Sequence, residues 1–218
     1  MHIIEPGVVA YTPISQALLF QIEHAGRTCY KSTSPQTLEG AEKFVRNLIK
    51  RGHEAMVEHA FVTLVFVNDR GVSHEEVRHR IASYAQESTR YCNYSKDKFD
   101  GQITYIDLHG GMQLDPVVSK LPKEVFDLIY EEWIEACMSA ERHYYRMIEL
   151  GATPQIARSV LNNSTKTEIV VTMNVREWRH FFKLRCAPDA HPQMRQVALQ
   201  ALQLFRDGCP VLVEDISY

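Results

Sequence analysis

Residues 167–175, TEIVVTMNV, run without a break into residues 176–185, REWRHFFKLR, and these two segments are the most informative about the fold. The first is rich in β-branched residues, which predicts a strand. The second places Trp178, Phe181, Phe182 and Arg185 at spacings of three and four, which predicts a helix with one apolar face. A strand is therefore expected to pass directly into a helix.

Both kinds of element are expected along the rest of the chain. Residues 60–68 and 102–108 have the composition of strands. Ser73, followed three residues later by Glu76, has the capping-box pattern and predicts a helix that reaches about Ser83. Four further helices are expected, at residues 39–50, 122–150, 154–161 and 192–208, and the second of them is the longest and ends at Gly151.

The order of these segments bears on the fold class. Strands and helices do not alternate as regular β-α-β units, which favours an α+β fold over a doubly wound one. We expect a mixed, largely antiparallel central sheet flanked by helices, including one long helix. Because no repeat, low-complexity tract or Gly/Ser linker interrupts the sequence, residues 1–218 are expected to form a single domain.

Composition limits the classes of partner. With 45% hydrophobic residues, 23% charged residues and a net charge of -3, the chain has the composition of a globular protein, and its overall charge does not favour nucleic-acid binding. Any anion that the protein binds must therefore be held by a local cluster of arginine or lysine. An odd number of cysteines, five, without a C-x-x-C pair favours neither a disulfide framework nor a zinc site.

The N-terminus and the hydropathy of the chain bear on its location. Residues 1–9 lack the pattern of a signal peptide, and no run of about 18 apolar residues could span a bilayer. We expect reduced thiols, a cytoplasmic location and no membrane partner.

The segment RHRIASYAQESTRY, residues 78–91, concentrates three arginines and a histidine. On the expected helix Arg78 and Arg80 would point about 200° apart, so they would serve two sites or one site shared between subunits. The hydroxyls and guanidinium of Ser88, Thr89 and Arg90 follow in a polar turn that suits a phosphate. The alternative is a surface helix held by salt bridges.

The pattern R-H-R, seven residues, S, met from Arg78 to Ser88, resembles the signature of flavin-dependent thymidylate synthases. Four further segments resemble this family in the expected order. They are Gly52-His53-Glu54 with Glu58-His59, then residues 157–161, 172–185 and 190–195.

The resemblance implies a methyltransferase that reductively methylates dUMP to dTMP. Methylenetetrahydrofolate would supply the carbon, FAD the hydride, and NADPH would reduce the flavin. The resemblance also implies a homotetramer whose active sites are shared between subunits, with arginines of separate segments converging around the nucleotide.

The resemblance further implies the site residues. Arg185 would be catalytic, since a permanently charged guanidinium beside uracil favours ionisation at the third nitrogen and activates the fifth carbon. Residues implied to bind the flavin are Glu58, Arg78, His79, Arg80, Gln86, Asn174, Arg176 and His180. Residues implied to bind dUMP are Glu75, Arg78, Gln86, Glu87, Ser88, Thr89, Arg90, Arg158 and Arg185.

Several positions depart from the family pattern. Glu75 stands where many relatives have Gln, and Gln86-Glu87 reverses the frequent order Glu-Gln, so the carboxylate is displaced by one residue. Ala55 replaces the usual Ser or Thr, which removes a side-chain contact to the flavin phosphate. Asn162 occupies a position that is often Pro, with a local structural effect only.

Some of these residues have alternative interpretations. His53 and His59 are six residues apart, whereas a helical metal pair requires a spacing of four, so no metal is expected. Ser88 has no evident base nearby and is expected to bind rather than attack. Arg185 could merely interact with its helix dipole. The chain could also bind nucleotide or flavin without catalysis, although the presence of Arg90 and Arg185 argues against this.

Overall fold

The computed structural model describes residues 1–92, 94 and 101–218, and its centre is a four-stranded antiparallel sheet. The strands follow the order β2 (Gly7–Ala10), β3 (Phe61–Asp69), β6 (Lys166–Asn174) and β4 (Ala82–Gln86). β3 and β6 pair along their full length, from Phe61 opposite Asn174 to Asp69 opposite Lys166. A separate parallel pair joins β1 (His2–Ile4) to β5 (Thr104–Ile106). The expected α+β fold with a largely antiparallel sheet is confirmed.

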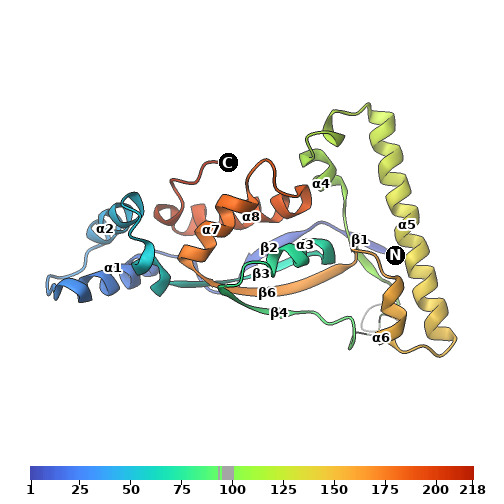
Figure 1. Ribbon diagram of the computed structural model, residues 1–218, viewed down its shortest axis with the longest axis horizontal. Coiled ribbons are helices and arrows are strands. Elements are labelled where there is room, and N and C mark those ends of the chain that lie inside the picture. The colour runs from blue at the N-terminus through green and yellow to red at the C-terminus, as the bar shows by residue number, and fades with distance from the viewer. Residues whose placement is uncertain (93, 95–100) are drawn as a thin grey trace.

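The helices are distributed around this sheet in three groups (Figure 1). α3 (Arg70–Glu76), α7 (Val175–Arg185) and α8 (Pro192–Gly208) lie along one face of the sheet, as Figure 1 shows. At one end lie α1 (Ala17–Tyr30), α2 (Leu38–Lys50) and the 3₁₀ helix η1 (Glu54–His59). At the other end lie α4 (His109–Leu114), η3 (Val118–Lys120), the long α5 (Lys123–Glu149), α6 (Pro154–Ala157) and η4 (Arg158–Val160), while η5 (Pro210–Leu212) follows α8.

The junction of β6 and α7 forms as the sequence predicts. The side chain of Asn174 accepts a hydrogen bond from the backbone N–H of Glu177 at 2.9 Å, which caps the helix. Trp178, Phe181 and Phe182 are buried and pack against one another at the centre of the main core. This rigid junction positions the polar residues on the other faces of α7.

The long helix α5 belongs to a second, smaller core. Cys137 and Tyr144 are buried there together with Tyr105 of β5. Gly151, with a φ of 96°, follows the helix in a left-handed conformation that favours glycine. Toward the start of α5, however, the apolar side chains of Val125 and Leu128 are 41% and 58% exposed, so this part of the helix has an apolar surface that the described residues leave open.

The predicted helix from Ser73 to about Ser83 is wrong. α3 begins at Arg70, because Asp69 accepts from the backbone N–H of Val72 at 2.6 Å, and it ends at Glu76. Ser73 does not cap it, since its hydroxyl donates to the carbonyl of Arg70. From Ala82 the chain pairs with β6 instead, and ladder hydrogen bonds replace helical ones. Arg78 and Arg80 therefore lie in the connection before β4, and the angle predicted between them on a helix does not exist.

Among the described helices, we find none that combines the length and apolarity needed to cross a bilayer.

Candidate active site

A cavity of about 450 Å³ lies between η1, the start of α7 and the segment before β4. It brings together four residues that the resemblance implies for the flavin, namely Glu58, Asn174, Arg176 and His180. Arg176 and His180 line it from one face of α7, as their spacing of four predicts. The cavity is also lined by residues to which the resemblance assigns no ligand contact, namely Glu54, Ile81, Glu177, Arg179 and Lys183.

The charged groups of this cavity are partly paired. Arg176 forms ion pairs with Glu58 and, at 3.6 Å, with Glu54. Arg179 is buried, and its Nη1 and Nη2 each lie 2.7 Å from a carboxylate oxygen of Asp215. Its buried Nε lies 3.7 Å from a carboxylate oxygen of Glu54, which is an ion pair beyond hydrogen-bond distance.

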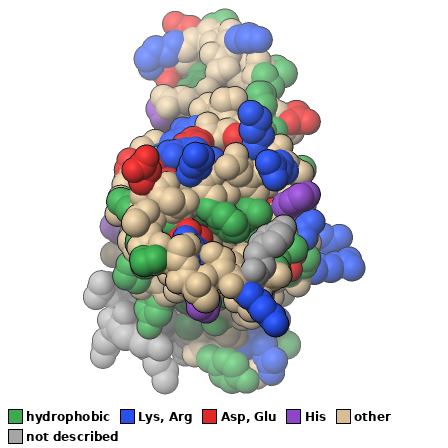
Figure 2. Space-filling view, turned by 90° about the vertical axis from the view of Figure 1, so that its left-hand side faces the viewer, with side chains coloured by type: hydrophobic (Ala, Val, Ile, Leu, Met, Phe, Trp, Pro, Cys, Tyr) green, Lys and Arg blue, Asp and Glu red, His purple; other side chains and the backbone are tan. Residues whose placement is uncertain are grey.

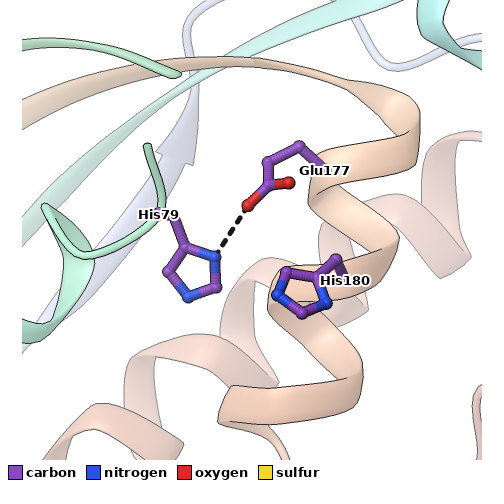
Figure 3. Close-up of side chains that lie close together, drawn as sticks. All are labelled: His79, Glu177 and His180. Carbon is purple, nitrogen blue, oxygen red and sulfur yellow. Dashed lines mark hydrogen bonds and ion pairs between the residues drawn. The ribbon is translucent and has the colours of Figure 1, made fainter. Parts of the chain in front are cut away.

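A second group, which we call the Arg185 cluster, consists of Arg185, Glu75, His79 and Glu177. Arg185 donates from Nη1 to the carboxylate of Glu75 at 2.5 Å and from Nη2 to the carbonyl of Glu75 at 3.1 Å. Its Nε donates to Nε2 of His79 at 3.1 Å. The other ring nitrogen of His79, Nδ1, lies 2.9 Å from Glu177 (Figure 3). Arg185 therefore belongs to a network joining α3, α7 and the segment before β4.

A buried acid lies behind this cluster. Glu76 accepts a hydrogen bond from Asn68 at 2.8 Å and is almost fully buried. Burial raises the pKa of Glu76 to about 8, so at neutral pH its carboxyl group is largely protonated. Glu76 therefore adds little negative charge near Arg185, whose directly bonded carboxylate is that of Glu75.

His79, Glu177 and His180 could in principle hold a metal ion, because their ligand atoms lie within 4.8 Å of one another (Figure 3). The guanidinium of Arg185 opposes this interpretation, since it occupies the lone pair of Nε2 of His79 and places a fixed positive charge 3.1 Å away. Glu54 and Glu58, the carboxylates between His53 and His59, are no better suited to a metal ion, because both form ion pairs with arginines.

The Arg158 cluster comprises Arg158, Ser88, Thr89 and Arg90. The backbone N–H of Tyr91 donates to the carbonyl of Ser88 at 3.1 Å, which forms the predicted polar turn. Arg158, just after α6, donates to the hydroxyl of Thr89 at 3.0 Å. Two distant segments therefore bring the guanidinium group of Arg158 to the hydroxyl of Thr89, which Ser88 and Arg90 flank in the chain. Hydroxyl and guanidinium donors of this kind suit a phosphate.

The reversed pair Gln86-Glu87 is engaged within the chain. The side-chain amide of Gln86 donates to the hydroxyls of Ser73 at 2.8 Å and Thr167 at 3.1 Å. Glu87 forms an ion pair with Lys166 at 2.9 Å. Lys166 is not among the site residues that the sequence indicates. Glu87 lies 79 residues from it in the chain, so no local pattern reveals this ion pair.

The three arginines of residues 78–91 are exposed at the surface. Arg78, Arg80 and Arg90 are exposed, and none of them forms an ion pair within the part of the chain that the structure describes. Arg90 lies 5.5 Å from the ring centre of Tyr91. Basic and acidic side chains are otherwise intermixed at the end of the molecule that carries α1 and α2 (Figure 2).

A further cavity, of about 490 Å³, lies between α1, α2 and η1. It is lined by Arg51, His53 and Ala55, among others, whereas Glu54 and Glu58 line the cavity beside α7. Two cavities therefore adjoin η1, one on each side. In the cavity between α1, α2 and η1, Ala55 provides no hydroxyl group.

The Arg185 and Arg158 clusters lie at opposite ends of β4. His79 precedes this strand and Thr89 follows it, and α6 and α7 lie at opposite ends of β6 (Figure 1). Five strand residues alone extend the chain by roughly 15 Å. The predicted convergence of Arg78, Arg90, Arg158 and Arg185 is therefore not achieved within one chain.

Two arginine-centred clusters and a polar cavity on an α+β fold are features of proteins that bind anionic organic ligands. The family described as thymidylate synthase complementing protein matches residues 8–211. The chain belongs to this family.

Relatives extend the comparison over most of the chain. A flavin-dependent thymidylate synthase of Corynebacterium aurimucosum is 34% identical, over 89% of this chain and 78% of its own length. One of Geobacter sulfurreducens is 32% identical, over 96% and 85%. One of Mycolicibacterium vanbaalenii is 33% identical, over 90% and 78%.

Proposed function

We propose that this protein is a flavin-dependent thymidylate synthase that methylates dUMP to dTMP, with methylenetetrahydrofolate as carbon donor and NADPH as reductant of FAD. The observation that carries the proposal is the cavity beside α7, in which Glu58, Asn174, Arg176 and His180 meet next to the Arg185 cluster. The family membership and the names of the relatives support the same activity.

The residues of the cavity fit FAD. Its volume of about 450 Å³ lies within the range of small-molecule sites, and its lining combines the acidic Glu54, Glu58 and Glu177 with the basic Arg176, Arg179 and Lys183. When bound, the reduced flavin supplies a hydride, and the protein supplies orientation and charge.

Arg158, Ser88, Thr89 and Arg90 hold the phosphate of dUMP in this proposal. Arg185 binds the uracil ring, where its positive charge favours loss of the proton from the third nitrogen. Its guanidinium stays charged at every working pH, so it stabilises that anion without titrating itself. Its alternative role at the helix C-terminus is less well supported, because Arg185 donates side-chain hydrogen bonds to His79 and Glu75.

Because the two clusters lie at opposite ends of β4, roughly 15 Å of strand apart, the proposal assigns to each site one cluster from each of two chains. A homotetramer provides such sites through symmetric contacts. The exposed Val125 and Leu128 of α5 are candidates for the surface that another copy covers.

Expression of this gene in a thymidine-requiring bacterium tests the proposal. Growth without thymidine is expected, and the purified protein should be yellow and form dTMP from dUMP only when folate and NADPH are present. Binding of FAD and dUMP without product would favour the alternative, a flavin-binding protein that has lost catalysis. A colourless protein that takes up no FAD would contradict both.

The cysteines provide a separate prediction. Cys186 and Cys209 are buried, and burial raises the pKa of their thiols to about 12 and about 11, so they do not form nucleophilic thiolates. Cys29 is exposed and Cys92 is half-buried, and Cys29→Ser and Cys92→Ser should each leave the rate of dTMP formation within about twofold. Loss of turnover in either variant would indicate covalent cysteine chemistry instead.

A further inference from the structure

His79 is held in a closed environment. It is 4% exposed, and its ring centre lies 5.1 Å from that of Phe181 and 5.5 Å from that of His180. Its backbone carbonyl accepts a hydrogen bond from the hydroxyl of Tyr84 at 2.6 Å. Figure 3 shows the ring beside Glu177 and His180 of α7. Packing therefore fixes the ring, and both nitrogens have partners within the chain.

The partners determine which nitrogen carries the proton. Arginine Nε is always a donor, so Nε2 of His79 must be the acceptor of the 3.1 Å hydrogen bond from Arg185. The proton of the neutral ring therefore resides on Nδ1 and is donated to the carboxylate of Glu177 at 2.9 Å. Burial lowers the pKa of His79 more than the hydrogen bond to Glu177 raises it, which agrees with a neutral ring.

We propose that His79 and Glu177 are positioning residues for Arg185: Glu177 holds the His79 tautomer in which Nε2 accepts from Nε of the arginine. This inference rests on the proposed function, in which Arg185 addresses uracil. It differs from the flavin contact that the resemblance implies for His79, since neither ring nitrogen is free for a ligand.

The geometry explains why such positioning matters. Of the five N–H groups of a guanidinium, three are used, one each from Nε, Nη1 and Nη2. One N–H therefore remains on each terminal nitrogen. A pyrimidine that has lost the proton of its third nitrogen presents adjacent acceptors along one edge. Because the directions of the remaining N–H groups are fixed by the plane of the guanidinium, rotation of the guanidinium would turn them away from these acceptors.

Two substitutions at one position separate positioning from packing. In His79→Gln the amide oxygen can replace Nε2 as acceptor, whereas in His79→Asn the shorter side chain does not reach Arg185. Titration of the FAD-loaded protein with dUMP, followed by calorimetry, should show affinity within about threefold of the parent for His79→Gln. His79→Asn should weaken it by about ten- to hundredfold, the range of a lost hydrogen bond to a charged group.

The same samples provide the readouts that overturn the inference. Equal dUMP affinity in the two variants, or loss of FAD absorbance in His79→Asn with dUMP binding intact, would refute positioning. If either variant fails to fold, ¹⁵N-histidine spectra of the parent protein decide, because the inference requires a protonated Nδ1 and an unprotonated Nε2. Absence of dUMP binding by the parent would instead contradict the proposed function.

Discussion

Arg185→Ala is expected to lower the rate of dTMP formation by about 10²- to 10³-fold, the typical cost of removing one group that stabilises developing negative charge. Arg185 does not line the cavity assigned to FAD, so the variant should retain the flavin. Removing the guanidinium also leaves Glu75 and Nε2 of His79 without their donor. The substitution therefore replaces a fixed cation beside uracil with an uncompensated carboxylate.

Steady-state turnover and flavin absorbance of the same preparation test this expectation. Arg46→Ala is a matched control, since Arg46 is an exposed arginine with ion pairs to Glu42 and Glu214 and no contact with the site. Arg185→Lys retains the charge without the planar fork and should recover only part of the activity. Undiminished turnover in Arg185→Ala would refute the activating role.

The elements that the sequence predicts correctly are those whose pattern is local. β3 and β6 are apolar strands with alternating burial, and α7 has one apolar face and a side-chain cap. The pairing of Arg176 with His180 in one cavity follows from their spacing of four on that helix. In these cases the pattern of neighbouring residues is enough to predict the element.

The wrong prediction for residues 73–83 arises from a contact that the sequence does not reveal. A capping-box pattern at Ser73 and Glu76 competes with the cap that Asp69 provides and with the ladder between β4 and β6. Pairing with a strand some 85 residues away outweighs local helix propensity here.

The helix α1 differs, because its apolar pattern is local and yet the sequence analysis does not predict it. Leu18, Leu19 and Ile22 are buried at a helical spacing that is present in the sequence. The side chain of the preceding Gln16 makes no capping hydrogen bond, so the sequence offers no clear start signal for this helix.

The contact of Glu177 with His79 is a part of the site that the sequence does not predict. Glu177 lies one helical turn before His180 on α7, and this spacing is visible in the sequence. Its functional partner, His79, lies 98 residues away. Only the fold shows that a carboxylate of α7 determines the state of a histidine in the signature.

Two inactive variants are expected to regain activity when their subunits are mixed. Arg158→Ala removes the group proposed for the phosphate, and Arg185→Ala removes the one proposed for uracil, at the opposite end of β4. If each site takes one cluster from each of two chains, random mixing of equal amounts leaves about one quarter of the sites with both arginines. Co-expression with two affinity tags, followed by assay of the doubly tagged oligomers, measures this recovery.

A mixture of Arg158→Ala with Arg90→Ala is the matched control, because both substitutions lie in the Arg158 cluster. Whichever chain supplies that cluster then lacks one of its arginines, and activity should stay at the level of the separate variants. Recovery in the first mixture but not in the second requires that the two clusters of one site come from different chains. Equal inactivity of both mixtures, with oligomers of the parent size, would show that a single chain must supply both clusters, and the separation along β4 would then have to close when ligands bind.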